Sequence, residues 1–180
     1  PASPGSPRLA AARIEDAMRA AVVTSDPYLT EIASHLILAG GKRLRPALAV
    51  AAGQIGGGNA SDDVVQGGVA CELVHLGSLY HDDVMDEAET RRGVETVNAR
   101  WGNLQAILAG DFLLSRASEI AASLGTEVAG LLARTIGWLC EGQIEELRHT
   151  YDVNRPEESY LASIHGKTAS LYGTAARIGG

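Results

Sequence analysis

The sequence predicts an all-α protein, and three of its properties support this fold class. Alanine and leucine are abundant, the hydrophobic residues show no strand-like alternation, and beyond the N-terminal tail proline occurs only at Pro27, Pro46 and Pro156. With 180 residues, of which 46% are hydrophobic, the chain can bury one sizeable core. We therefore expect one domain over residues 8–180. Residues 1–7, rich in proline, glycine and serine, are expected to be a disordered tail or a remnant of cloning.

The expected helices follow one another along the chain without an internal repeat or a dividing linker. Their ranges are 8–22, 28–39, 46–55, 62–86, 103–123, 127–149 and 157–178. Residues that favour helix ends mark several boundaries, namely Ser61 and Thr126 as N-caps, Pro46 and Pro156 in first turns, and glycines 40–41 and 56–58 as stops. The long fourth helix contains Gly67, Gly68 and Gly77, which indicate close packing around a central element.

The charge and the cysteine content exclude several classes of function. A net charge of −7 and a pI near 5.2 argue against general nucleic-acid binding, which requires a basic surface that displaces counterions. Cys71 and Cys140 lie far apart, so neither a disulfide framework nor a zinc site is expected, and a reducing cytoplasm fits best. Charged residues or glycines interrupt every apolar run before it reaches about 18 residues, so the sequence predicts no membrane span.

Acidic residues near the end of the fourth helix form the first candidate site. Because successive helical residues are separated by about 100°, His75, Asp82 and Asp86 lie on the same face. Carboxylates four residues apart repel each other unless a cation lies between them, and magnesium prefers such oxygen ligands and bridges them to substrate phosphates. The alternative is a solvated acidic helix end, although Leu79 and Met85 place apolar side chains beside the acids.

Two basic clusters lie on either side of this helix in the sequence. The first, GGKRLRP, combines a glycine turn with Lys42, Arg43 and Arg45, and this combination suits a diphosphate. The second consists of Arg91 and Arg92, in the loop that follows the acids. The alternatives are a charged helix end for the first cluster and a structural salt-bridge network for the second. A magnesium platform between two basic clusters favours a site for phosphorylated substrates.

The order of several longer motifs identifies a family resemblance over residues 30–180. The chain contains, in the order found in bacterial polyprenyl diphosphate synthases of the long-chain type, the motifs GGKRLRP, VHLGSLYHDDVMDEAETRRG, WGN, AILAGDFLL, GQIEEL and GKT. The resemblance implies the N-terminal half of a helical bundle of the isoprenoid synthase type. It also implies a magnesium-dependent trans-prenyltransferase, which condenses isopentenyl diphosphate with an allylic diphosphate to a polyprenyl diphosphate of C20 or longer, by ionisation, condensation and elimination.

The resemblance assigns roles to individual residues. Asp82, Asp83 and Asp86 match the first aspartate-rich motif, and Asp82 and Asp86 match its magnesium ligands. The residues that match those holding isopentenyl diphosphate are Lys42, Arg45, His75 and Arg92. The residues that match the allylic diphosphate site are Arg91, Gln143, Lys167 and Thr168. The catalytic set implied is Asp82, Asp83, Asp86, Arg91 and Lys167. The alternatives are that Gln143 is a solvated helix residue and that Lys167 and Thr168 merely follow a packing glycine.

The turns before the acidic residues bear on the length of the product. By the same resemblance, Val74, Gly77 and Ser78 face the tunnel that receives the growing chain, where bulky aromatic residues form a floor in short-chain members. Gly77 and Ser78 are small, so we expect a product longer than C15. The alternative is that these small residues serve helix packing and that the floor lies deeper, for example on the helix that carries Phe112.

The chain departs from the family pattern in its length. Family members are roughly twice as long, and a second aspartate-rich motif that binds further magnesium has no counterpart here. We therefore expect a truncated chain that is nearly inactive alone, and a whole enzyme that is a cytoplasmic homodimer. A non-catalytic subunit of such a synthase is the main alternative. A His/Asp dimetal phosphohydrolase, suggested by His81, Asp82 and Asp83 with His75 nearby, would need further histidine ligands, for which the sequence shows no evident pattern.

Overall fold

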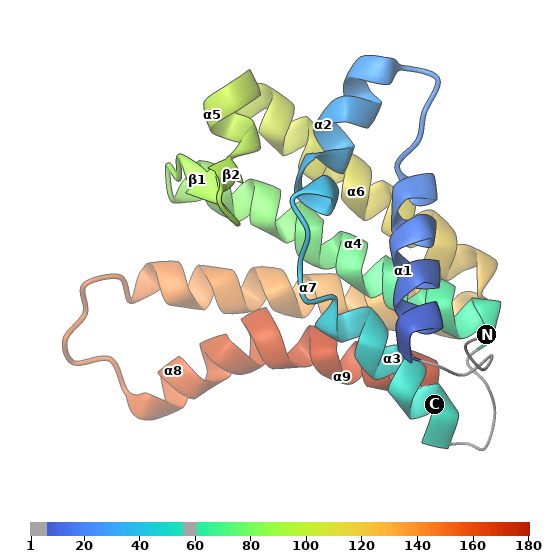
Figure 1. The fold of residues 1–180 in the computed structure, drawn as a ribbon. Coiled ribbons are helices and arrows are strands. Elements are labelled where there is room, and N and C mark those ends of the chain that lie inside the picture. The colour runs from blue at the N-terminus through green and yellow to red at the C-terminus, as the bar shows by residue number, and fades with distance from the viewer. Residues whose placement is uncertain (1–6, 56–60) are drawn as a thin grey trace.

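The computed structural model describes residues 7–55 and 61–180, and it confirms the all-α class (Figure 1). The helices are α1 (Pro7–Ala21), α2 (Pro27–Leu38), α3 (Leu44–Ile55), α4 (Asp62–Met85), α5 (Val97–Trp101), α6 (Asn103–Ser123), α7 (Thr126–Arg148), α8 (Glu157–Ile164) and α9 (Ser170–Gly179), with a π-helical turn, η1 (His165–Ala169), before α9. Between α4 and α5, two short strands, β1 (Thr90–Arg91) and β2 (Val94–Glu95), form an antiparallel hairpin.

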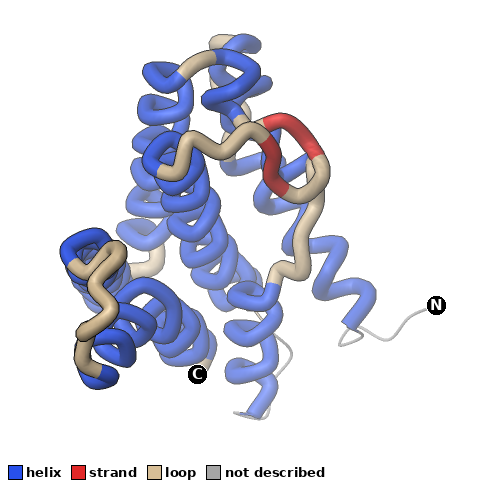
Figure 2. Tube along the Cα trace, turned by 90° about the vertical axis from the view of Figure 1, so that its left-hand side faces the viewer, coloured by secondary structure: helices blue, strands red, loops and turns tan. Residues whose placement is uncertain are grey.

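Helix α4 lies in the middle of the described structure and is surrounded by other helices (Figure 1, Figure 2). It contacts α1, α3, α5, α6, α7 and α9, and its side chains form much of the hydrophobic core. A Cβ at Gly77 would lie 3.0 Å from the Gly110 carbonyl oxygen of α6, and one at Gly68 would lie 2.8 Å from Pro46 Cα of α3. A Cβ at Gly67 would collide with a side chain of α9. The close packing that these glycines predicted is therefore confirmed.

The C-terminal segment runs along α7 and is less regular than the single helix expected over 157–178. It consists of α8, η1 and α9 (Figure 1). Glycines allow the close approach, since a Cβ at Gly142 would lie 2.5 Å from the Lys167 backbone nitrogen, and one at Gly166 would lie 2.8 Å from the Trp138 carbonyl oxygen. A π-turn holds an extra residue relative to an α-helical turn, so it redirects the side chains that follow.

The hairpin and α5 occupy a segment for which the sequence analysis predicted no element. The Thr96 side chain N-caps α5. The ring of His35 on α2 meets Trp101 edge to face at 5.0 Å, and its Nε2 atom lies 2.7 Å from the Glu95 carbonyl oxygen. These contacts fasten the hairpin, which carries the second basic cluster, to α2.

Of the two residues predicted as helix N-caps, one is confirmed and one is not. Ser61 is the N-cap of α4, and its hydroxyl accepts a hydrogen bond from the backbone of the first turn, as expected. The prediction that Thr126 is an N-cap was wrong, because Thr126 is already the first residue of α7. Gly125, with φ of 115°, precedes it and provides no side-chain cap.

The prolines and glycines at helix ends follow the expected pattern with one shift. Pro46 lies in the first turn of α3, whereas Pro156 is the N-cap of α8 and precedes its first turn. Gly40 follows the end of α2 with φ of 86°, a value that L side chains rarely adopt. Glycines 56–58 lie outside the described residues. Within the described part of the chain, no helix has the length and hydropathy needed to cross a membrane.

Candidate active site

Two cavities meet at Arg45 and His75, which line both of them. The first, here called the basic cavity, has a volume of about 350 Å³. Its charged, polar and aromatic lining consists of Lys42, Arg43, Arg45, Glu72, His75, Arg92 and Tyr172. These residues come from the loop before α3, from α3, from the middle of α4, from the hairpin and from α9. All four residues assigned to isopentenyl diphosphate thus line one cavity, although their roles stay predictions.

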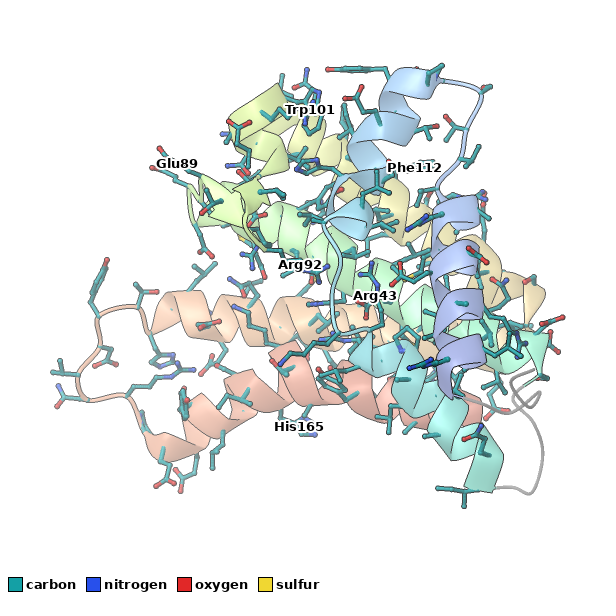
Figure 3. The ribbon with its side chains drawn as sticks, in the orientation of Figure 1. Arg43, Glu89, Arg92, Trp101, Phe112 and His165 are labelled. Carbon is teal, nitrogen blue, oxygen red and sulfur yellow. The ribbon has the colours of Figure 1, made fainter. Side chains whose placement is uncertain are left out.

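The backbone of the loop after α2 brings basic side chains together. Arg92 Nη1 donates to the Leu36 carbonyl oxygen at 3.3 Å and also to that of Gly40, which anchors the hairpin beneath the loop. A Cβ at Gly41 would lie 2.8 Å from Arg92 Nη1 and 3.0 Å from Arg43 Nη1, so a side chain at this position would displace a guanidinium group. Figure 3 shows Arg43 and Arg92 next to each other beside α4.

Two of these guanidinium groups are buried against carboxylates. Arg43 Nε donates to Glu15 Oε1 at 2.6 Å, and Arg43 Nη2 donates to the Ile37 carbonyl oxygen at 2.8 Å. Glu72 lies 3.6 Å from Arg43 and 3.9 Å from Arg45, and its burial raises the pKa of its carboxyl, an effect that both arginines counteract. Among the described residues, Arg43 Nη1, Arg45 Nε and Glu72 Oε2 are buried without a hydrogen-bond partner. Unpaired N–H donors in a basic cavity suit an anionic ligand.

The His75 side chain in the wall between the cavities is uncharged near neutral pH. Burial, together with the charges of Arg45, Arg92, Arg91 and Arg43, lowers the pKa of His75 to about 3. A neutral imidazole offers one N–H donor and one acceptor instead of a positive charge. The positive charge of the basic cavity therefore comes from its lysine and arginines.

The second cavity, here called the apolar cavity, lies between α4 and α7 and has a volume of about 470 Å³. Its walls are mainly apolar side chains, namely Leu79, Met85, Leu139, Ile144 and Leu147. Polar and charged residues also line it, namely Arg45, His75, Ser78, His81, Asp82, Gln143, Lys167 and Thr168. Apolar walls with polar groups that converge on the same cavity are typical of a site that holds an apolar ligand and orients it by polar contacts.

The three aspartates of the acidic motif have different surroundings. Asp82 lines the apolar cavity, and burial raises the pKa of its carboxyl, an effect that Lys167 opposes and Asp86 adds to. Asp86 is the exposed C-cap of α4, one turn further along the same face. Asp83 is only 1% exposed, and Arg91 Nε donates to it at 2.5 Å. Arg91 thus forms a structural salt bridge, as in the alternative interpretation of the second basic cluster. It does not line either cavity.

The donor set at the end of α4 fits a magnesium ion that is shared with a ligand. In residues 7–55 and 61–180, no group of three or more His, Cys, Asp or Glu side chains could hold a metal ion by itself. The two carboxylates of Asp82 and Asp86 leave most of an octahedral shell to other oxygens, and phosphate and water oxygens are those that magnesium usually keeps. The nearby Lys167 ammonium would attract the same phosphate.

The π-turn η1 brings Lys167 and Thr168 to the apolar cavity. Lys167 Nζ donates to Glu146 Oε2 of α7 at 2.7 Å, which holds the ammonium group at the cavity. Gln143 lies nearby on α7, and its Oε1 atom is buried without a partner among the described residues. The allylic assignments of Gln143, Lys167 and Thr168 are therefore brought together in space, whereas that of Arg91 is not.

Comparison with known proteins identifies the family. Residues 26–180 match the polyprenyl synthetase family. The chain belongs to this family. It is 44% identical over 173 residues to a nonaprenyl diphosphate synthase of Mycobacterium tuberculosis, and the match covers 96% of this chain and 52% of that protein. It is 39% identical over 163 residues to a geranylgeranyl diphosphate synthase of Methanosarcina mazei, with coverage of 87% and 50%.

A solved structure agrees with this membership of the polyprenyl synthetase family. A polyprenyl synthase from Caulobacter crescentus CB15, crystallised with calcium and isoprenyl diphosphate, superposes with a TM-score of 0.90 at 34% identity, over 99% of this chain and 57% of that one. The fold is therefore of the isoprenoid synthase type, as expected. The chain spans about half the length of the curated relatives that it matches.

The three residues expected to set product length have different surroundings in the fold. Ser78 lines the apolar cavity, whereas Gly77 faces α6, with no room for a side chain, and Val74 is fully buried in the core. Gly77 therefore has the helix-packing role that the sequence analysis held as the alternative. Phe112 on α6 packs against the core and is absent from the cavity lining (Figure 3).

Within the described ranges, the residues behind the phosphohydrolase alternative do not form a group of three or more side chains that could hold a metal ion. His81 Nε2 lies 3.1 Å from the Ile107 carbonyl oxygen and 3.4 Å from Asp111 Oδ1. His165 is exposed on η1 (Figure 3), and His35 is engaged at the hairpin. These positions, together with the polyprenyl synthetase family match, favour the prenyltransferase interpretation.

Three residues of the basic cavity received no role from the sequence, namely Arg43, Glu72 and Tyr172. Arg43 was noted only as part of the GGKRLRP cluster. Glu72 carried a usable signal, because it is a charged residue in an apolar helix, three positions before His75 on the same face. Tyr172 gave no signal, since its place in the cavity depends on how α9 packs against α3.

Proposed function

We propose that the protein is a trans-prenyltransferase that condenses isopentenyl diphosphate with an allylic diphosphate to give a polyprenyl diphosphate of C20 or longer. The observation that carries this proposal is the pair of cavities with a common wall at Arg45 and His75. One cavity is basic, and the other has mainly apolar walls with Asp82 in its lining. The reaction requires two diphosphates whose hydrocarbon parts meet, and this arrangement supplies a place for each.

The basic cavity is the proposed site of isopentenyl diphosphate, held by Lys42, Arg45, His75 and Arg92. The Nε–H group of Arg45, which is buried without a hydrogen-bond partner among the described residues, would bind a phosphate oxygen strongly, because the interaction is charge-assisted and shielded from water. Neutral His75 adds directional hydrogen bonds without adding to the repulsion among the arginines.

The apolar cavity is the proposed site of the allylic substrate. Asp82 and Asp86 would hold magnesium on its diphosphate, with Lys167, Gln143 and Thr168 around them, and Arg91 would join after release from Asp83. Magnesium supplies stabilisation of the negative charge that develops on the leaving diphosphate. The apolar side chains would exclude water, which protects the allylic cation until isopentenyl diphosphate attacks it and the resulting cation loses a proton to the released diphosphate.

The growing chain is proposed to extend from this cavity past Ser78. Of the three residues assigned to product length, Ser78 is the one that lines the apolar cavity, so the other two would act indirectly if at all. A small residue at this position supports a product longer than C15, because added isoprene units gain burial at about 25 cal/mol per Å².

We expect the enzyme to work in the cytoplasm as a homodimer, and the 180-residue chain alone to turn over slowly or not at all. A non-catalytic subunit stays the alternative, and the same assay separates the two.

The test is incorporation of labelled isopentenyl diphosphate, with an allylic primer and magnesium, into extractable polyprenyl products. It should be run on this chain and on the protein extended to the length of its relatives. We expect magnesium-dependent product from the extended protein and loss of product in Asp82→Ala. Release of phosphate without carbon–carbon bond formation would favour the phosphohydrolase instead, and full activity of Asp82→Ala would refute the assignment of the acidic motif.

A further inference from the structure

Arg45 occupies an unusual place in the molecule, because its side chain borders both cavities and is almost completely buried. It lies in the first turn of α3 and is 8% exposed. Its Nε atom is buried without a hydrogen-bond partner among the described residues. A long, flexible, charged side chain in this position needs neighbours that fix its orientation, since it can otherwise point toward either cavity.

Two side chains from other helices contact the Arg45 guanidinium. The ring of Tyr172 on α9 lies with its centroid 4.5 Å from Arg45 Cζ, a distance suited to a cation–π interaction. Glu72 Oε2 on α4 lies 3.9 Å from Arg45 Nη1. The guanidinium is therefore held from both α4 and α9.

The backbones that carry these three residues are fixed by close contacts. Gly68, one turn before Glu72, allows α3 to lie against α4 at Pro46, the neighbour of Arg45. Helices α3 and α9 also pack closely, since a Cβ at Gly179 would collide with the Ala49 backbone. The contacts of Arg45 thus follow from rigid packing of three helices and not from the mobility of surface side chains.

We propose that Tyr172 and Glu72 are positioning residues, which hold the Arg45 guanidinium in the wall between the cavities so that its unpaired donor serves the diphosphate of isopentenyl diphosphate. The inference rests on the proposed function of the basic cavity. Without these contacts, the like charges of Arg43 and Arg92 in the same cavity would favour Arg45 conformations directed away from it.

The first test measures the affinity of this chain for isopentenyl diphosphate by isothermal titration without magnesium. Tyr172→Leu removes the aromatic face, and we expect the affinity to fall by about ten-fold. Tyr172→Phe keeps the ring and removes only the hydroxyl, so it is the matched control and should stay within about two-fold of the unmodified chain. In an Arg45→Gln background, Tyr172→Leu should have no further effect, because its role acts through Arg45.

The second test changes the carboxylate without changing its charge. Glu72→Asp keeps the negative charge but withdraws it from Arg45 by one methylene group, and we expect weaker binding of isopentenyl diphosphate that is again lost in the Arg45→Gln background. Glu72→Gln is less informative, because removal of a negative charge beside the ligand attracts an anion by itself.

Several outcomes would overturn the inference. These are unchanged affinity in both Tyr172→Leu and Glu72→Asp, an equal loss in Tyr172→Phe and Tyr172→Leu, and losses that add fully to that of Arg45→Gln. A failure of the unmodified chain to bind isopentenyl diphosphate is a different result, because it would remove the proposed function of the basic cavity and this inference with it.

Discussion

The neutral state of His75 predicts a specific dependence of stability on pH. Its pKa is lowered to about 3 in the folded protein, whereas an unfolded chain has a histidine pKa of about 6.5. Between these two values the unfolded state binds the proton and the folded state does not, so the free energy of unfolding decreases as the pH falls. The stability that neutral His75 provides is therefore fully present above about pH 6.5 and is lost progressively below it.

The size of this effect follows from the two pKa values. Each pH unit between them changes the free energy of unfolding by about 1.4 kcal/mol, so His75 alone destabilises the fold by about 2 kcal/mol at about pH 5. Glu72, Asp82 and Asp83 act in the opposite direction, because burial raises the pKa of each carboxyl and protonation then favours the folded state. The pH dependence of the unmodified protein alone thus cannot isolate the histidine.

The comparison with His75→Gln isolates it, because glutamine has similar hydrogen-bonding groups and no titration in this range. Urea unfolding, followed by circular dichroism at several values between about pH 7 and about pH 5, gives the free energy and the m-value for both proteins. As the pH falls from about 7 to about 5, we expect the free energy of unfolding of His75→Gln to rise by about 2 kcal/mol relative to that of the unmodified protein. The m-values of the two proteins should stay equal. Parallel pH dependence of the two proteins would refute the claim that burial beside the arginines keeps His75 neutral.

Four further predictions concern the apolar cavity, its neighbouring helix contact and the acidic motif. Asp82→Ala should abolish magnesium-dependent binding of a diphosphate analogue in calorimetry, and unchanged binding would remove the metal assignment. Ser78→Phe should shorten the product of the extended protein while keeping the fold. Gly77→Phe should instead lower the free energy of unfolding by about 3 kcal/mol or more in urea unfolding, because no space exists against α6. An equally stable Gly77→Phe variant would contradict this packing. Arg91→Ala should leave the buried Asp83 carboxylate without its partner and lower stability by about 3 kcal/mol, and a loss of less than about 1 kcal/mol would show that this salt bridge is not structural.

The sequence predicted the parts of the fold that depend on local signals. Helix α4 combined a Ser61 cap, a long apolar pattern and glycines for close packing, and all three were found. The hairpin and the π-turn were missed because their stability comes from distant partners. His35 on α2 fastens the hairpin, and contacts of Gly142 with the chain at Lys167 accompany the π-turn, so neither leaves a periodic pattern in its own segment.

The candidate site also combines features that local sequence signals predict with features that depend on distant contacts. The motif spacing placed Asp82 and Asp86 on one helical face, and the residues assigned to isopentenyl diphosphate do line one cavity. The contact between Asp83 and Arg91 and the place of Tyr172 depend on how the hairpin and α9 dock, which pair spacing along a helix cannot reveal. Ser78 and Gly77 are adjacent in the sequence but face different neighbours, and only the packing of α6 distinguishes them.

The common wall between the cavities also has a thermodynamic consequence. A ligand in the basic cavity that draws the Arg45 guanidinium toward itself changes the electrostatic potential in the apolar cavity, where the same side chain forms part of the lining. By linkage, a ligand in the apolar cavity must change the affinity of the basic cavity by the same factor. On the proposed function, the two cavities would thus be coupled at their common wall of Arg45 and His75, and the sign of the cooperativity can be measured by titrating one ligand in the presence of the other.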